Sequence, residues 1–130
     1  MGLQEKRLAK EIQAEKLPEF EAKVKEITGS DIKVDIDWDT FTAYDSYPLS
    51  RLDIVFDDIS SFLKKICADD LGKEALQEKL NTIKLTNTDN PEELKMELSD
   101  NVLSFKLQLA GSSFGAYTDS QIVSYVESQL

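Results

Sequence analysis

Residues 94–109 restrict the fold more than any other segment, because apolar and polar side chains alternate along them on both sides of a short polar turn. Leu94, Met96 and Leu98 alternate with charged residues before the turn at Ser99-Asp100-Asn101. The apolar positions after the turn are Leu103, Phe105, Leu107 and Leu109, and the polar ones are Ser104, Lys106 and Gln108. A period of two is typical of a strand with one buried and one solvated face. The sequence therefore predicts a β-hairpin with Phe105 in the core.

Three further segments are predicted to be strands. Residues 31–39 alternate apolar with charged side chains, and Leu52, Ile54 and Phe56 repeat the pattern, so we expect these two strands to pair with each other. Ile83 and Leu85 mark another strand.

Helical periodicity occupies the remaining segments. Residues 3–28 predict a helix in two pieces, divided near Pro18 and ended by Gly29. Asp57 or Asp58 is expected to cap a second helix, and Gly72 to interrupt the helical region before it resumes over 73–80. The buried stripe of that second helix is Ile59, Phe62, Leu63 and Ile66. Thr118 and Gln121 predict a capping box for a last helix.

The predicted fold class is α+β, in the order αββαβββα. We expect an antiparallel-dominated sheet of about five strands with helices packed on one face, because every predicted strand has one apolar and one polar face. The 130 residues are expected to form a single domain, 1–130. Residues 1–17 are the exception, since only a weak apolar face around Leu8 and Ile12 supports them. They are expected to be a mobile arm or a helix that docks on a partner.

Composition excludes several classes of function. The chain has no histidine, which removes Ser-His-Asp triads, histidine-ligated zinc and the commonest general base. Cys67 is the single cysteine, so no internal disulfide forms, and a cytoplasmic location is expected. No apolar run is long enough to span a membrane. A net charge of −10 disfavours nucleic acid as a partner. We expect no cofactor and no catalytic activity.

The negative charge is concentrated in residues 30–60, where eight aspartates stand against Lys33 and Arg51. If residues 31–39 form a strand, Asp35, Asp37 and Asp39 lie on one of its faces, with Asp53 or Asp57 alongside on the neighbouring strand. Three interpretations stay open: a solvated face, a surface for a basic partner, or a metal site. The spacing of the three aspartates matches the start of an EF-hand loop, but Thr40 and Ser46 stand where glycine and glutamate are required.

Aromatic residues lie within the same acidic segment. Trp38, Phe41, Tyr44 and Tyr47 either anchor a partner or fold back onto the core. The predicted partner-binding residues are Asp35, Asp37, Asp39, Trp38, Phe41, Tyr44, Tyr47 and Asp53.

Three functions remain as hypotheses. The first is a non-catalytic binding or inhibitory module, similar in kind to immunity proteins, that acts on a basic protein. The second is a metal-dependent enzyme that uses the aspartates of residues 35–39. The third is a structural or regulatory subunit that docks through Leu8, Ile12 and Leu17.

Overall fold

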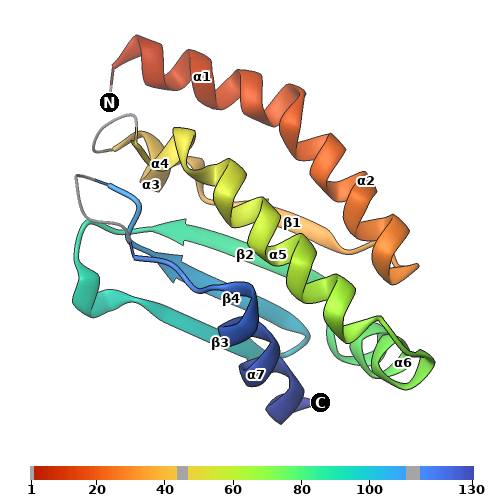
Figure 1. Cartoon of the computed structure of the whole chain (residues 1–130). Coiled ribbons are helices and arrows are strands. Elements are labelled where there is room, and N and C mark those ends of the chain that lie inside the picture. The colour runs from red at the N-terminus through yellow and green to blue at the C-terminus, as the bar shows by residue number, and fades with distance from the viewer. Residues whose placement is uncertain (1, 44–46, 111–114) are drawn as a thin grey trace.

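The computed structural model describes residues 2–43, 47–110 and 115–130, and within them the chain folds as an α+β protein (Figure 1). The sheet in these residues has four strands: β1 (Lys33–Ile36), β2 (Thr82–Asn87), β3 (Lys95–Ser99) and β4 (Val102–Leu107). Their spatial order is β1-β2-β4-β3. β1 pairs parallel with β2, β2 pairs parallel with β4, and β4 pairs antiparallel with β3. The expectation of an antiparallel-dominated sheet of five strands is therefore wrong.

The parallel pairing follows from the connection between β1 and β2. The described residues of this connection form four helices: α3 (Trp38–Thr42), α4 (Tyr47–Ser50), α5 (Leu52–Ile66) and α6 (Asp70–Lys79). A helical crossover returns the chain to the end of the sheet where the first strand began, so the next strand runs parallel to it. A strand at residues 52–56 was predicted to follow β1 through a loop, but the first turns of α5 occupy that position.

The side chains of residues 52–56 show why they are helical. Val55 and Phe56 are both buried, and Ile54, which a strand would place inside with Leu52 and Phe56, is 49% exposed. The buried positions of α5 recur every three or four residues and continue through the predicted stripe to Ile66. Within residues 52–56, the period of a strand and the period of a helix both place Leu52 and Phe56 on the buried side. Only a longer window distinguishes the two periods.

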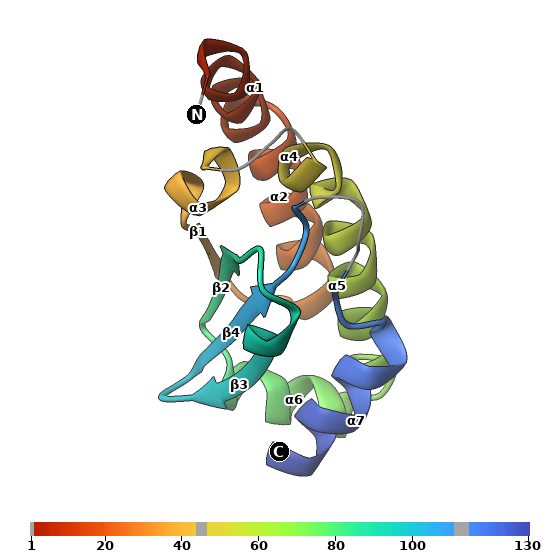
Figure 2. The same cartoon turned by 90° about the vertical axis from the view of Figure 1, so that its left-hand side faces the viewer.

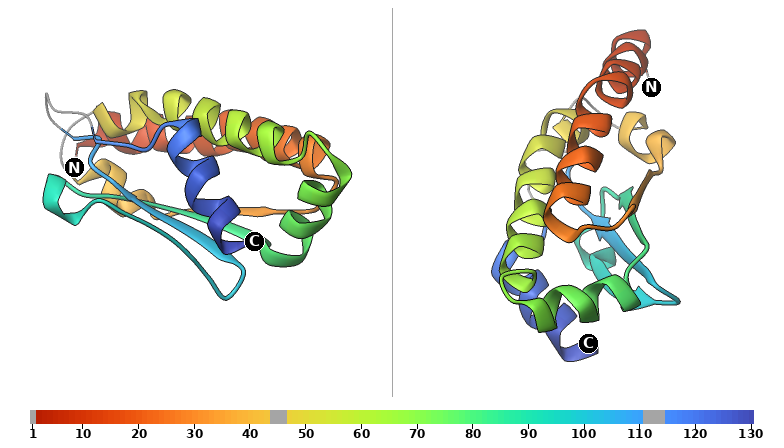
Figure 3. Two further views of the ribbon diagram at one scale, coloured as in Figure 1. Left: turned by 60° about the horizontal axis from the view of Figure 1, so that its bottom comes forward. Right: turned by 90° about the vertical axis from the view of Figure 1, so that its right-hand side faces the viewer.

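Helices cover one face of the sheet (Figure 3). α5 packs between α2 (Lys16–Thr28) and α7 (Asp119–Gln129), and the strand residues that face this layer are buried. These residues include Val34, Ile83, Leu85, Leu103 and Phe105. The opposite face carries polar residues such as Lys33, Lys84 and Ser104, which are exposed or half-buried.

The N-terminal helices belong to the same core. α1 (Leu3–Ala14) contacts α3 and α4, as Figure 2 shows, and buries Ala9 and Ile12. Leu17 of α2 is also buried, so it and Ile12 are covered by this chain itself. The break between the two helices falls at Glu15, which places Pro18 in the first turn of α2, where its missing N–H costs nothing. Gly29 ends α2 with a φ of 73°, as a left-handed C-cap.

The predicted hairpin is confirmed. Asp100 and Asn101 connect β3 to β4, and their φ angles of 52° and 66° are those of the two-residue turn that suits the twist of a hairpin. Phe105 is 3% exposed. Gln108 was expected to face solvent, but β4 has ended before it, and its side chain is buried and donates to the carbonyl of Ala110. The capping box of Thr118 and Gln121 is also present.

Candidate functional site

Three of the predicted acidic residues lie at the carboxyl end of β1, but they do not share one strand face. Asp35 is on the polar face of β1, Asp37 stands at the N-cap position of α3, and Asp39 is in the first turn of that helix. The strand ends at Ile36, so the alternation of the sequence continues where the backbone has already turned. We call Asp35, Asp37, Trp38 and Asp39 the β1–α3 acidic surface. Its three carboxylates are exposed.

Asp53 lies apart from this surface. It belongs to α5 rather than to a strand, and its carboxylate pairs with Lys16 of α2 at 2.8 Å. Helix α2 packs against both β1 and α5 (Figure 3), and Asp53 belongs to α5, whereas the acidic surface belongs to β1 and α3. The structure therefore divides the predicted set of aspartates between two regions.

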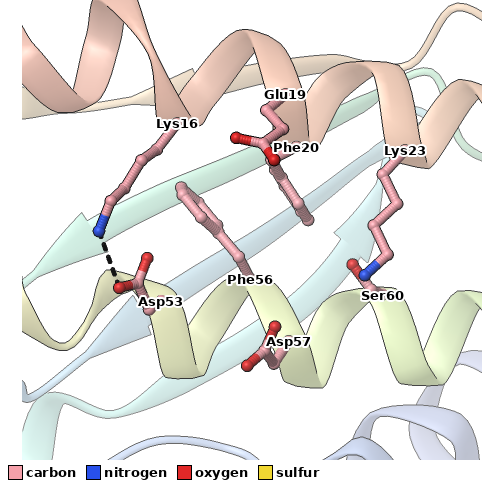
Figure 4. Close-up of a pocket in the computed structure, with 8 residues that line it drawn as sticks. All are labelled: Lys16, Glu19, Phe20, Lys23, Asp53, Phe56, Asp57 and Ser60. Carbon is pink, nitrogen blue, oxygen red and sulfur yellow. Dashed lines mark hydrogen bonds and ion pairs between the residues drawn. The ribbon is translucent and has the colours of Figure 1, made fainter.

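A groove of about 410 Å³ runs between α2 and α5, on the side of the helices away from the sheet (Figure 4). Its floor is the stacked pair of Phe20 and Phe56, whose ring centroids are 4.3 Å apart. The α2 side carries Lys16, Glu19 and Lys23, and the α5 side carries Asp53, Asp57 and Ser60. Both rings are buried, at 5% and 6% exposure, and charged side chains of both helices stand above them.

The predicted aromatic residues have different surroundings. Phe41 is fully buried and packs near Trp38, with ring centroids 6.5 Å apart, so Phe41 is a core residue. Trp38 itself is half-buried. Tyr47 is 48% exposed, and the guanidinium of Arg51 lies 4.4 Å from its ring centroid. Tyr44 lies outside the described residues.

A buried polar network holds the carboxyl ends of the parallel strands together. The amide of Asn87, at the end of β2, donates to the carbonyl of Thr40 in α3 and accepts from the backbone N–H of Leu109. Arg51 donates to the carbonyl of Leu109 at 2.7 Å. Ligands of parallel sheets often bind at this end, but here the polar groups bind one another and fix the loops next to the β1–α3 acidic surface.

Two carboxylates with opposite pKa shifts lie where α5 meets α7. Asp119 accepts hydrogen bonds from Lys65 and Ser61, which lower its pKa to about 2. Desolvation raises the pKa of Asp58, and the negative charge of Asp119 raises it further. The hydrogen bonds that Asp119 accepts from Lys65 and Ser61 join α7 to α5, so Asp119 stabilises the packing of the two helices, whereas the charged form of Asp58 opposes it.

The remaining features concern the Cys67 thiol, possible metal ligands and membrane-spanning helices. Burial raises the pKa of the Cys67 thiol, which disfavours the reactive thiolate. Within residues 2–43, 47–110 and 115–130, no three acidic or cysteine side chains converge as a metal site would require. In the same ranges no helix has the length and apolar character to span a membrane.

One group of residues was missed by the sequence reasoning. Lys84, Lys95 and Lys106 are the only basic residues after position 82, and all three lie on the open face of the sheet. Each stands at a polar position of an alternating segment, but their proximity depends on the strand order, which no local pattern reveals.

Comparison of the chain with known protein families, curated proteins and solved structures finds no match. Function must therefore be inferred from the chain's own surfaces.

Proposed function

We propose that this protein is a non-catalytic binding module that recognises a basic protein through the β1–α3 acidic surface. The supporting observation is the state of Asp35, Asp37 and Asp39. All three carboxylates are exposed, and none forms an ion pair with another described residue. Lysines or arginines of a partner would relieve the repulsion among them and accelerate association.

Trp38 adds an anchor to this charge. It stands between Asp37 and Asp39 and is partly exposed, and its inner side packs against the core. A rigid aromatic residue within a charged rim is the composition typical of binding hot spots. Asp53 is a peripheral contributor in this proposal, because it is already paired with Lys16. The proposed setting is the cytoplasm, with no nucleic acid or membrane as partner.

The test compares two variants of equal charge. One carries Asp35→Asn, Asp37→Asn and Asp39→Asn, and the other carries Asp89→Asn, Glu92→Gln and Asp100→Asn, which are also exposed. Both raise the net charge by the same amount. In pull-downs from the native organism, we expect the wild type and the second variant to retain the same basic protein and the first variant to lose it.

Association of the purified pair is expected to slow steeply as salt rises, since screening shortens the reach of the charges. If both variants retained the basic protein equally well, the proposal would be refuted, because the position of the carboxylates would then not matter for binding. The alternative of a metal-dependent enzyme has no observation in its favour among the described residues.

A further inference from the structure

The open face of the sheet carries a compact basic grid on three neighbouring strands. β2 contributes Lys84 and Thr86, β4 contributes Ser104 and Lys106, and β3 contributes Lys95 and Glu97. The register places Lys84, Ser104 and Glu97 in one row and Thr86, Lys106 and Lys95 in the next. Neighbouring strands are about 4.8 Å apart and same-face residues about 6.8 Å, so the three lysine side chains reach one common point.

The six residues of this grid all line one hollow of about 230 Å³. Three ammonium groups and one carboxylate give it a net charge of +2, within a chain whose net charge is −10. Lys95 stands directly opposite Lys106, an arrangement of like charges that destabilises a sheet unless an anion compensates it.

Compensation within the protein is incomplete. Lys95 pairs with Glu97 at 3.7 Å, and Lys106 pairs with Glu93 at 3.9 Å, both long contacts between exposed groups. Lys84 forms no ion pair among the described residues, although Asp35 is in register with it on β1. The hydroxyls of Thr86 and Ser104 form no hydrogen bond in the described structure, so both remain available as donors.

We infer that this grid binds a small phosphate-type dianion, either free phosphate or a phosphate monoester. Two hydroxyl donors and three ammonium groups that line one hollow suit a group with several acceptor oxygens and about −1.5 to −2 charges, which would replace the long contacts to Glu93 and Glu97. The acidic remainder of the molecule favours a small anion over a nucleic acid. A long polyanion would extend beyond the grid into repulsive regions, whereas a small anion stays within about one Debye length, 8 Å, of the lysines.

The inference is independent of the proposed function, and amide-resolved NMR tests it on the whole chain. Inorganic phosphate and glycerol phosphate are titrated separately at constant ionic strength, with chloride as the replaced anion. We expect saturable shifts centred on residues 84–86 and 104–106, and the tighter of the two probes identifies the source of the group. Shifts that chloride reproduces, or that never saturate, would overturn the inference.

Variants then separate a site from general electrostatics. Lys84→Gln or Lys106→Gln is expected to weaken binding about three- to fivefold, as for exposed charged contacts. Lys64→Gln, an exposed residue of α5, serves as the control and is expected to leave binding unchanged. Glu97→Gln removes the one carboxylate of the grid and is expected to tighten binding. Equal losses in all three lysine variants, Lys64→Gln included, would leave only the total charge as the cause and refute the site. Unchanged affinity in Glu97→Gln would also refute it, because the carboxylate of the grid would then not oppose the anion.

Discussion

Among the glycines that the structure describes, Gly72 has the least room for a side chain. A Cβ atom there would lie 2.1 Å from the carbonyl oxygen of Ile66, and the Gly72 N–H donates to the Asp69 side chain that caps α6. Gly72→Ala gains about 1 kcal/mol in helix propensity but must displace backbone. We expect a net loss of about 2 kcal/mol in urea unfolding.

The matched control is Gly2→Ala, where the new Cβ meets only the end of the flexible Glu5 side chain. That change is expected to be nearly neutral. If Gly72→Ala proved as stable as the wild type, the close approach of α6 to the end of α5 would be wrong.

Asp58 is expected to make the stability of the protein depend on pH. Its pKa is raised, so its charged form destabilises the folded state, and the cost is present above the raised pKa and disappears as pH falls. Asp58→Asn is therefore expected to stabilise the protein at neutral pH, and the gain should vanish near about pH 3, where both states are protonated. Asp57→Asn, at an exposed neighbour, is the control. Unfolding curves at the two pH values that show no gain at neutral pH would contradict the burial of Asp58.

The pKa of Asp119 is shifted in the opposite direction. Because its folded pKa is lowered to about 2, its contribution is complete above the unfolded value of about 4 and is lost as pH falls between the two. Asp119→Ala should thus destabilise the protein at neutral pH, and the difference from wild type should shrink through this acid range. A difference that stayed constant with pH would assign the effect to packing rather than to the contacts with Lys65 and Ser61.

At the scale of elements, local signals were the ones that sequence could predict. The hairpin at Asp100 and Asn101, the C-cap at Gly29 and the capping box at Thr118 each depend on a few adjacent residues, and each is present. The first turns of α5 were mistaken for a strand because a five-residue window fits both periodicities. Because a helical crossover joins parallel strands, this one error also led to the wrong prediction of an antiparallel-dominated sheet.

The same division between local signals and long-range packing applies to the candidate site. The exposure of Asp35, Asp37 and Asp39 could be predicted from their place in an alternating segment. The assignment of Asp53 to a helix that packs against α2 depends on long-range packing, and the burial of Phe41 depends on the packing of α3. The lysine grid needs the β2-β4-β3 order. Such long-range contacts are not encoded in the local pattern.

The central position of β4 leads to a prediction about the core. Phe105 is buried between the sheet and α7, near Tyr117, and its replacement leaves a cavity that neighbours fill only partly. Phe105→Ala is expected to lower the free energy of unfolding by about 3 to 5 kcal/mol. Ser104→Ala, on the opposite face of the same strand, is expected to change it little. A loss below about 1 kcal/mol for Phe105→Ala in denaturant melts would mean that the two faces of β4 are reversed.

Considered as a whole, the molecule separates its charges. The carboxyl end of β1 carries Asp35, Asp37 and Asp39, which form no ion pair among the described residues, and the three lysines that follow position 82 lie on β2, β4 and β3. Charge patterns of this kind affect association and its salt dependence rather than the fold. Added salt is expected to weaken both the capture of a basic protein at one surface and the binding of a phosphate dianion at the other, but different variants weaken each.

The single tryptophan allows the most direct test of the proposed partner surface, because Trp38 stands between Asp37 and Asp39. Labelling with 5-fluorotryptophan gives one fluorine signal at this position, and the basic protein recovered by pull-down is added without label. We predict that the signal shifts or broadens in proportion to the complex formed, and that salt restores the free signal. A signal that stays unchanged while the complex forms would place the partner elsewhere and contradict the account.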